Sequence, residues 1–167
     1  TVHTGSQQAS SSLEIIGNVY GKTSATTAYL DSIEFTIGNT AGGTPIDITQ
    51  MLVTFVCGTT SVVIPFDEKA SEDALGLSSS KELTDTSDGK WYVTETYNNV
   101  GDQTTSEDNK NKPLEPGEQF VLKIEFPAAG AALKPNTRFS VNLQPAVGAA
   151  FPIKKTVPST LYAVNIL

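Results

Sequence analysis

Apolar and polar residues alternate along several short stretches of the chain, which is the pattern of half-buried β-strands. In the stretch 30–38, Ile33, Phe35 and Ile37 share one face, and polar residues occupy the other. The stretches 119–126 and 137–143 alternate in the same way. Each of the three is therefore predicted to be a strand with one face in a hydrophobic core.

Other stretches are apolar or β-branched without this alternation. The runs 46–57 and 62–66 are separated by Gly58-Thr59-Thr60, which favours a β-hairpin. Further strands are expected at 13–20, 91–97 and 159–167, and a short helical turn is expected within 71–83. No long helical periodicity occurs. About eight short strands separated by Gly- and Pro-containing turns predict an all-β, antiparallel β-sandwich.

The residue counts limit the chemistry of this 167-residue chain, whose length fits one domain. It contains one His (His3), one Cys (Cys57) and one Arg (Arg138). A disulfide within the chain and a Cys/His zinc site are therefore excluded, and histidine catalysis would depend on His3 near the terminus. Cys57 lies in an apolar run and is expected to pack as a small buried residue. These counts remove most of the common catalytic routes, but they do not exclude enzymatic activity.

The charge is uneven along the chain, whose net charge is -7. The residues from 67 to 118 hold 13 of the 18 acidic residues and five Lys. An acidic chain with one Arg is a poor nucleic-acid binder. Its apolar runs are far shorter than the ~20 residues of a spanning helix, so we expect no membrane partner for this chain. The acidic region is either a set of solvated loops or a place where carboxylates hold a hard cation.

Hard oxygen ligands are most concentrated in the segment 101–110. Calcium takes about 6–8 oxygens and often draws several of them from one flexible loop, although the spacing here differs from the EF-hand loop. We therefore expect a divalent cation, calcium first and magnesium second, with its ligands among Asp102, Gln103, Glu107, Asp108 and Asn109. The segment 85–89 also carries two Asp and a Gly, but it fits a turn with Asx capping equally well.

Several short motifs resemble those of archaellins, the archaeal flagellins. The opening TGSQQASSSLEIIGNVYG is similar to the place where the long N-terminal helix of that family runs into the first strand. The element P-I-D-I follows at 45–48. The last third carries L-x-P-G-E at 114–118, L-x-P-N-T at 133–137, P-x-x-G-A at 145–149 and P-x-x-L at 158–161. The resemblance covers both flanks of the chain and leaves out the acidic middle.

The resemblance implies a structural subunit of the archaellum, the extracellular swimming filament of archaea, and therefore a protein without enzymatic activity. In that family an apolar N-terminal helix precedes an immunoglobulin-like β-sandwich, and the helices bundle inside the filament while the sandwiches tile its outside. Residues 1–12 would then be the end of the helix or a linker, and residues 13–167 the outer β-sandwich domain. The apolar helix itself is missing from this sequence. Some family members carry a metal-binding loop on the β-domain, which supports the prediction of a cation site in the segment 101–110.

The resemblance also implies the partners, which would be further copies of the chain or other archaellins in a helical filament. Such an assembly joins unlike surface patches head to tail. We expect these patches around 46–50, 127–136 and 145–158. The alternative function is that of an extracellular β-sandwich for carbohydrate binding or adhesion, with Trp91, Tyr92 and Tyr97 as a stacking platform. Such aromatic residues belong more often to the core and its rim than to a ligand platform, so we favour that interpretation for Trp91 and Tyr92.

Overall fold

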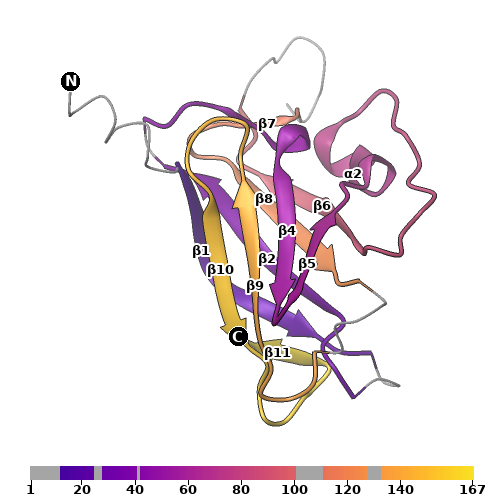
Figure 1. Cartoon of the computed structure of the whole chain (residues 1–167). Helices are drawn as coiled ribbons and strands as arrows, with labels where there is room; N and C mark the ends of the chain where they lie inside the picture. The colour runs from indigo at the N-terminus through magenta and orange to yellow at the C-terminus, as the bar shows by residue number, and fades with distance from the viewer. Residues whose placement is uncertain (1–11, 25–27, 41, 101–110, 128–132) are drawn as a thin grey trace.

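The computed structural model describes residues 12–24, 28–40, 42–100, 111–127 and 133–167, which form two packed antiparallel sheets (Figure 1). A five-stranded sheet has the order β11-β1-β2-β8-β6, and a four-stranded sheet has the order β10-β9-β4-β5. The strands β3 and β7 pair separately. The elements are β1 (Leu13–Lys22), β2 (Ser32–Asn39), β3 (Ile46–Asp47), η1 (Ile48–Gln50), β4 (Leu52–Cys57), β5 (Thr60–Ile64), α2 (Glu68–Leu75), β6 (Lys90–Tyr97), β7 (Pro113–Leu114), β8 (Gln119–Glu125), β9 (Arg138–Gln144), β10 (Phe151–Thr156) and β11 (Val164–Ile166).

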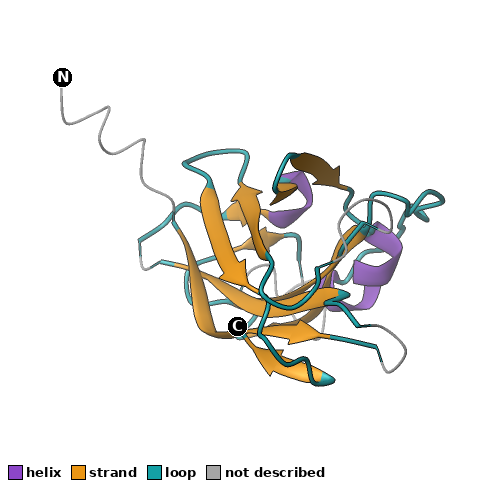
Figure 2. Cartoon of the chain, turned by 60° about the horizontal axis from the view of Figure 1, so that its bottom comes forward, coloured by secondary structure: helices purple, strands orange, loops and turns teal. Residues whose placement is uncertain are grey.

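The core lies between the two sheets and is built from the alternating residues that the sequence pattern identified. Ile33, Phe35 and Ile37 of β2 are almost completely buried. The inward residues of the neighbouring strand and of the opposite sheet are equally buried, namely Phe120, Leu122, Ile124, Phe139, Val141 and Leu143. The prediction of an all-β sandwich is confirmed. Figure 2 shows strands making up most of the molecule and the helical segments at its periphery.

The predicted hairpin is confirmed in β4 and β5, where Cys57 lies opposite Thr60. Gly58 in the turn has a φ of +57°, a left-handed conformation that glycine adopts without a steric penalty. Cys57 is half-buried and packs against the core, and its Sγ lies 3.5 Å from the Arg138 carbonyl oxygen. It therefore packs as a small apolar residue, although less completely buried than expected.

The C-terminal strand buries a polar residue and exposes its apolar residues. Within β11, the apolar residues Val164 and Ile166 are exposed, and the polar Asn165 between them is buried. Its side-chain Nδ2 donates to the carbonyl oxygens of Gly21 at 3.2 Å and Tyr162 at 2.8 Å. Two satisfied hydrogen bonds remove the usual penalty of burying an amide, so the register of this short strand follows Asn165.

The helix α2 begins and ends earlier than the helical turn expected within 71–83. Asp67 caps its N-terminus, since its Oδ1 accepts a hydrogen bond from the Ala70 N–H at 3.0 Å. Gly76 ends it in a left-handed conformation with a φ of +61°. Among the described residues, no helix is long and apolar enough to cross a membrane. The predicted helix end at 1–12 lies outside the described residues except for Ser12.

Candidate metal centre

Two of the motifs found in the sequence lie side by side in the structure. Ile46 of the P-I-D-I element pairs with Leu114 of the L-x-P-G-E motif, which joins β3 to β7. Asp47 caps η1, because its Oδ1 accepts hydrogen bonds from the Thr49 N–H at 3.0 Å and the Thr49 hydroxyl at 2.6 Å. The Ile48 N–H donates to the Lys112 carbonyl oxygen at 3.2 Å. These contacts fix the backbone that leads into β8.

The L-x-P-G-E motif forms a tight turn that places a carboxyl group inside the protein. The Glu118 N–H donates to the Glu115 carbonyl oxygen at 3.0 Å, and Gly117 has a φ of +91°. Pro116 at the second position and a positive φ at the third are typical of a type II turn. Glu118, which immediately precedes β8, is only 1% exposed. A buried carboxyl group without a basic partner requires a separate explanation.

Glu118 is only partly satisfied by its neighbours. Its Oε1 accepts a hydrogen bond from the Glu115 N–H at 3.3 Å. Among the described residues, Glu118 Oε2 and Glu115 Oε2 are buried without a hydrogen-bond partner. Burial, followed by the adjoining Glu115 carboxyl group, raises the pKa of Glu118 to about 8. Two adjacent carboxyl groups with unfilled acceptor positions favour either a retained proton or a bound cation.

Two asparagines bring further oxygens to the same region. Asn111 Nδ2 donates to the Val100 carbonyl oxygen at 3.1 Å. Within the described part of the chain, Asn111 Oδ1 and Asn99 Oδ1 are both buried and lack a hydrogen-bond partner. The Val100 N–H in turn lies close enough to Glu118 to lower its pKa, against the larger effect of burial. Val100 thus links the asparagines to the Glu115 and Glu118 pair.

These four side chains have the chemistry of a site for a hard divalent cation. Carboxylate and amide oxygens are the ligands that calcium and magnesium prefer. The described residues contain no group of three or more His, Cys, Asp or Glu side chains that could hold a metal. A site here would therefore combine the two carboxyl groups with amide oxygens and with ligands from elsewhere in the chain. We call Asn99, Asn111, Glu115 and Glu118 the oxygen cluster.

The oxygen cluster adjoins the segment predicted to bind a cation. Asp102, Gln103, Glu107, Asp108 and Asn109 all lie outside the described residues, so their prediction is not tested. Their segment starts directly after Val100 and ends directly before Asn111. The sequence analysis missed all four members of the cluster. The available signal was an acidic residue placed after Pro-Gly at the entrance of a strongly alternating strand.

The other acidic candidate, Asp85–Gly89, forms a turn. Asp85 Oδ1 accepts a hydrogen bond from the Ser87 N–H at 2.9 Å, and this contact lowers the pKa of Asp85. The Gly89 N–H donates to the Thr86 carbonyl oxygen at 3.0 Å. Both Asp side chains are exposed. The arrangement fits the Asx-capped turn, which was one of the two interpretations of this segment.

The aromatic platform proposed for carbohydrate binding is not formed. Trp91 is 1% exposed and packs against Phe66, with ring centroids 4.5 Å apart. Tyr92, the next residue of the same strand, points to the opposite face of the sheet and is half-buried. Only Tyr97 of the three is substantially exposed. Trp91 therefore belongs to the core, which confirms the favoured interpretation of this residue, and the alternative in which it stacks on a sugar is wrong.

Comparison with known proteins gives concordant results. Residues 1–155 match the archaeal-type flagellin family. The chain is 31% identical over 167 residues to probable flagellin 1 of Archaeoglobus fulgidus, covering 100% of this chain and 75% of that protein. The fold is similar to the archaeal flagellum of Methanospirillum hungatei strain JF1, with a TM-score of 0.62, 17% identity and coverage of 99% and 77%. It is also similar to flagellin FlaB1 of Methanocaldococcus jannaschii, with a TM-score of 0.65, 22% identity and coverage of 92% and 94%.

The fold and these matches define a class of protein, the β-sandwich subunits of extracellular filaments, which are structural proteins and not enzymes. The chain belongs to the archaeal-type flagellin family. Its members assemble into the multi-subunit archaellum outside the cell. The family, the fold class, the non-enzymatic character, the filament partners and the extracellular location predicted from the sequence are thereby confirmed.

Proposed function

We propose that this chain is a subunit of a filament used for swimming, and that a divalent cation stabilises its outer domain. Calcium is the expected cation, and magnesium is the alternative. The observation that carries the metal proposal is the oxygen cluster, whose four side-chain oxygens are buried and lack hydrogen-bond partners among the described residues. Leaving such groups unsatisfied costs about 1–3 kcal/mol each, and a cation that several of them reached would offset that cost.

The number and type of ligands also support calcium. Asn99, Asn111, Glu115 and Glu118 offer four oxygens, whereas calcium takes about 6–8. Asp102, Gln103, Glu107, Asp108 and Asn109 lie on the chain between Val100 and Asn111 and offer the remaining ligands. A cation bound by both sets would connect the segment 101–110 to the start of β8. Because binding would require the folded arrangement, it would raise the stability of the domain.

Calorimetric titration of calcium into chelator-treated protein tests the metal proposal. We expect saturable heat and a rise in Tm, and we expect both to be lost in Glu118→Gln and strongly reduced in Asp108→Asn. Asp88→Asn is the matched control, because it removes one exposed carboxylate from the turn before β6. Absence of heat and an unchanged Tm at millimolar calcium in the unsubstituted protein would rule the site out. Competition with magnesium decides between the two cations.

The swimming role is tested in the source organism. Deleting the gene should abolish swimming and remove the chain from filaments sheared from the cells. Returning the unsubstituted gene should restore both. A deletion strain that swims at the normal speed would contradict the motility proposal, even if filaments remain visible by electron microscopy.

A further inference from the structure

Two regions of the described sequence, one central and one C-terminal, carry opposite charge. No Asp or Glu follows Glu125, whereas four basic residues do, namely Lys134, Arg138, Lys154 and Lys155. The stretch from Asp67 to Gly89 contains seven acidic residues and two Lys. A sequence divided in this way gives a dipolar molecule if the fold keeps the two regions apart.

The fold places these regions on opposite sides of the sandwich. The strands β10 and β5 are the two edges of the four-stranded sheet, and β11 and β6 are the two edges of the five-stranded sheet. The basic strands β9 and β10 lie toward the side of the sandwich that is bounded by β10 and β11. The acidic helix α2 follows β5 and covers β6, on the side that is bounded by these two strands. Figure 1 shows β10 and α2 on opposite flanks of the molecule.

The basic side has two exposed cations, Arg138 and Lys154, and the half-buried Lys155 beside two hollows. In the β9–β10 register, Lys154 lies opposite Ser140 and Thr156 lies opposite Arg138, so Arg138 and Lys154 share one face. A hollow of ≈ 450 Å³ is lined by Arg138, Lys154 and Lys155, and one of ≈ 430 Å³ between β1 and β10 is lined by both lysines. None of the three cations forms an ion pair within the described residues. We call them the basic edge.

The acidic side has exposed carboxylates of the opposite charge. Glu68 and Glu72 are partly buried and already accept hydrogen bonds from the Lys81 N–H and the Lys69 side chain. Asp67 is buried and pairs with Lys90. The other four acidic residues of this stretch are exposed and form no ion pair in the part of the chain that the structure describes, namely Asp73, Glu82, Asp85 and Asp88. We call these four the acidic edge.

We propose that the basic edge of one copy docks against the acidic edge of a second copy of this chain. Complementary patches on opposite sides make a head-to-tail contact, which repeats from copy to copy and leaves one free edge of each kind at the ends. Exposed charge pairs contribute orientation and association rate more than affinity. The contact is therefore weak between isolated domains and gains strength from repetition. This inference rests on the proposed function in a filament and names the surfaces that face each other there.

A second explanation for the basic edge makes the opposite prediction. Lys and Pro on an edge strand block unwanted pairing with other strands, and β10 carries Pro152, Lys154 and Lys155 on such an edge. If protection were the sole role of these lysines, neutralising them would increase self-association. If they dock against carboxylates, neutralising them would decrease it.

Sedimentation velocity of two neutralised variants tests the proposal. One variant carries Arg138→Gln and Lys154→Gln, and the other carries Asp73→Asn and Asp85→Asn; Asn at 85 can still cap the turn. The unsubstituted chain should self-associate at about 10 mM salt, where the Debye length is about 30 Å, and dissociate at about 1 M salt, where it is about 3 Å. Each variant alone should associate about tenfold more weakly. Their mixture should form a 1:1 dimer and nothing larger, because one edge of each kind remains.

Several outcomes would overturn the proposal. The unsubstituted chain could stay monomeric at low salt, or its association could be independent of salt. The variant with Arg138→Gln and Lys154→Gln could associate more strongly than the unsubstituted chain. The mixture of the two variants could stay monomeric. Carbodiimide cross-linking gives a second readout, since it should join Lys154 of one copy to Asp73 or Asp85 of another. The presence of the chain in sheared filaments is measured separately, so the docking surfaces can fail while the filament function stands.

Discussion

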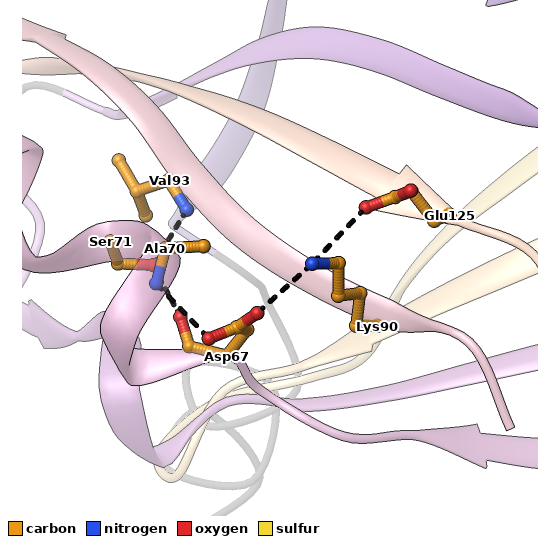
Figure 3. A network of polar contacts seen from close by, with 6 residues as sticks. All are labelled: Asp67, Ala70, Ser71, Lys90, Val93 and Glu125. Carbon is orange, nitrogen blue, oxygen red and sulfur yellow. Dashed lines mark hydrogen bonds and ion pairs between the residues drawn. The ribbon is translucent and has the colours of Figure 1, made fainter. Parts of the chain in front are cut away.

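The hydroxyl oxygen of Ser71 accepts a hydrogen bond from the Val93 backbone N–H at 3.0 Å, which ties α2 to the edge of the five-stranded sheet (Figure 3). The same hydroxyl donates to the Asp67 carbonyl oxygen at 2.9 Å. The neighbouring backbone closes the edge further, because the Asp67 N–H donates to the Trp91 carbonyl oxygen at 2.9 Å. An unpaired edge strand invites association with other chains. In this protein, α2 and the residues before it cover the edge of β6.

Replacing Ser71 by Ala is expected to destabilise the domain by about 1–3 kcal/mol, because it leaves the buried Val93 N–H without an acceptor. Chemical denaturation followed by fluorescence of the single tryptophan measures the change. Ser78→Ala is the control, because Ser78 is exposed in the segment after α2 and its loss should change stability by less than about 0.5 kcal/mol. Equal effects of the two substitutions would show that the Ser71 hydrogen bond contributes nothing.

Asp67 combines a helix cap with an ion pair, and two substitutions separate them (Figure 3). Its Oδ2 lies 3.2 Å from the Lys90 Nζ, which is also 3.7 Å from Glu125 Oε2. Asp67→Asn keeps an oxygen for the Ala70 N–H and should cost less than about 1 kcal/mol, since Lys90 retains Glu125. Asp67→Ala removes the cap as well and should cost about 1–2 kcal/mol more. If Asp67→Asn destabilises the domain as much as Asp67→Ala in denaturation curves, the stabilising contribution of Asp67 comes from its ion pair and not from the helix cap.

The sequence predicted the sandwich well because its strands alternate. In β2, burial alternates from Ile33 to Ile37, as the apolar pattern predicted, since a strand of period two can place its apolar side chains in the core in only one register. The C-terminal strand shows the limit of this reasoning. There Val164 and Ile166 are exposed, and the hydrogen bonds of Asn165 to Gly21 and Tyr162 set the register, which the apolar content of the segment does not reveal.

The candidate site was predicted only in part, for a related reason. Acidic residues gathered in the segment 101–110 are visible as composition, and they led to a prediction that stays untested. The oxygen cluster depends on a turn that buries Glu118 and on contacts between residues 99–100 and 111–118. Neither spacing nor composition reveals a buried carboxyl group without a partner. This feature follows from the folded arrangement of the two chain segments beside the acidic stretch.

Two glycines with a left-handed backbone should respond very differently to substitution by Ala. Gly117 has a φ of +91° and open space where a Cβ would lie, so Gly117→Ala should cost about 1–2 kcal/mol from the backbone alone. Gly89 has a φ of +78°, but its Cβ would lie 2.2 Å from the Glu125 carbonyl oxygen. Gly89→Ala should therefore cost more and lower Tm further in a thermal denaturation series. Equal Tm values for the two variants would contradict the close approach of Gly89 to β8.

The raised pKa of Glu118 predicts a pH dependence that calcium should reverse. In the unfolded chain this carboxyl group ionises near its ordinary pKa of 4.5, whereas in the folded metal-free protein the pKa is about 8. Between these values the folded protein keeps a proton that the unfolded chain has released, so the free energy of unfolding falls as the pH rises. Below about pH 4.5 both states are protonated and this contribution is constant.

Denaturation curves at about pH 5 and about pH 8, each with chelator or with calcium, measure this effect. With chelator, the unsubstituted protein should be less stable at the higher pH. Calcium should restore stability most strongly there, because a cation replaces the proton that the buried carboxyl group would otherwise retain. Glu118→Gln keeps the shape of the side chain without its charge, so it should flatten the pH dependence and remove the calcium response. Glu82→Gln, at an exposed position, should leave both unchanged. Stability in chelator that does not change between the two pH values would show that Glu118 is ionised in the folded protein, and its burial would then need another positive partner.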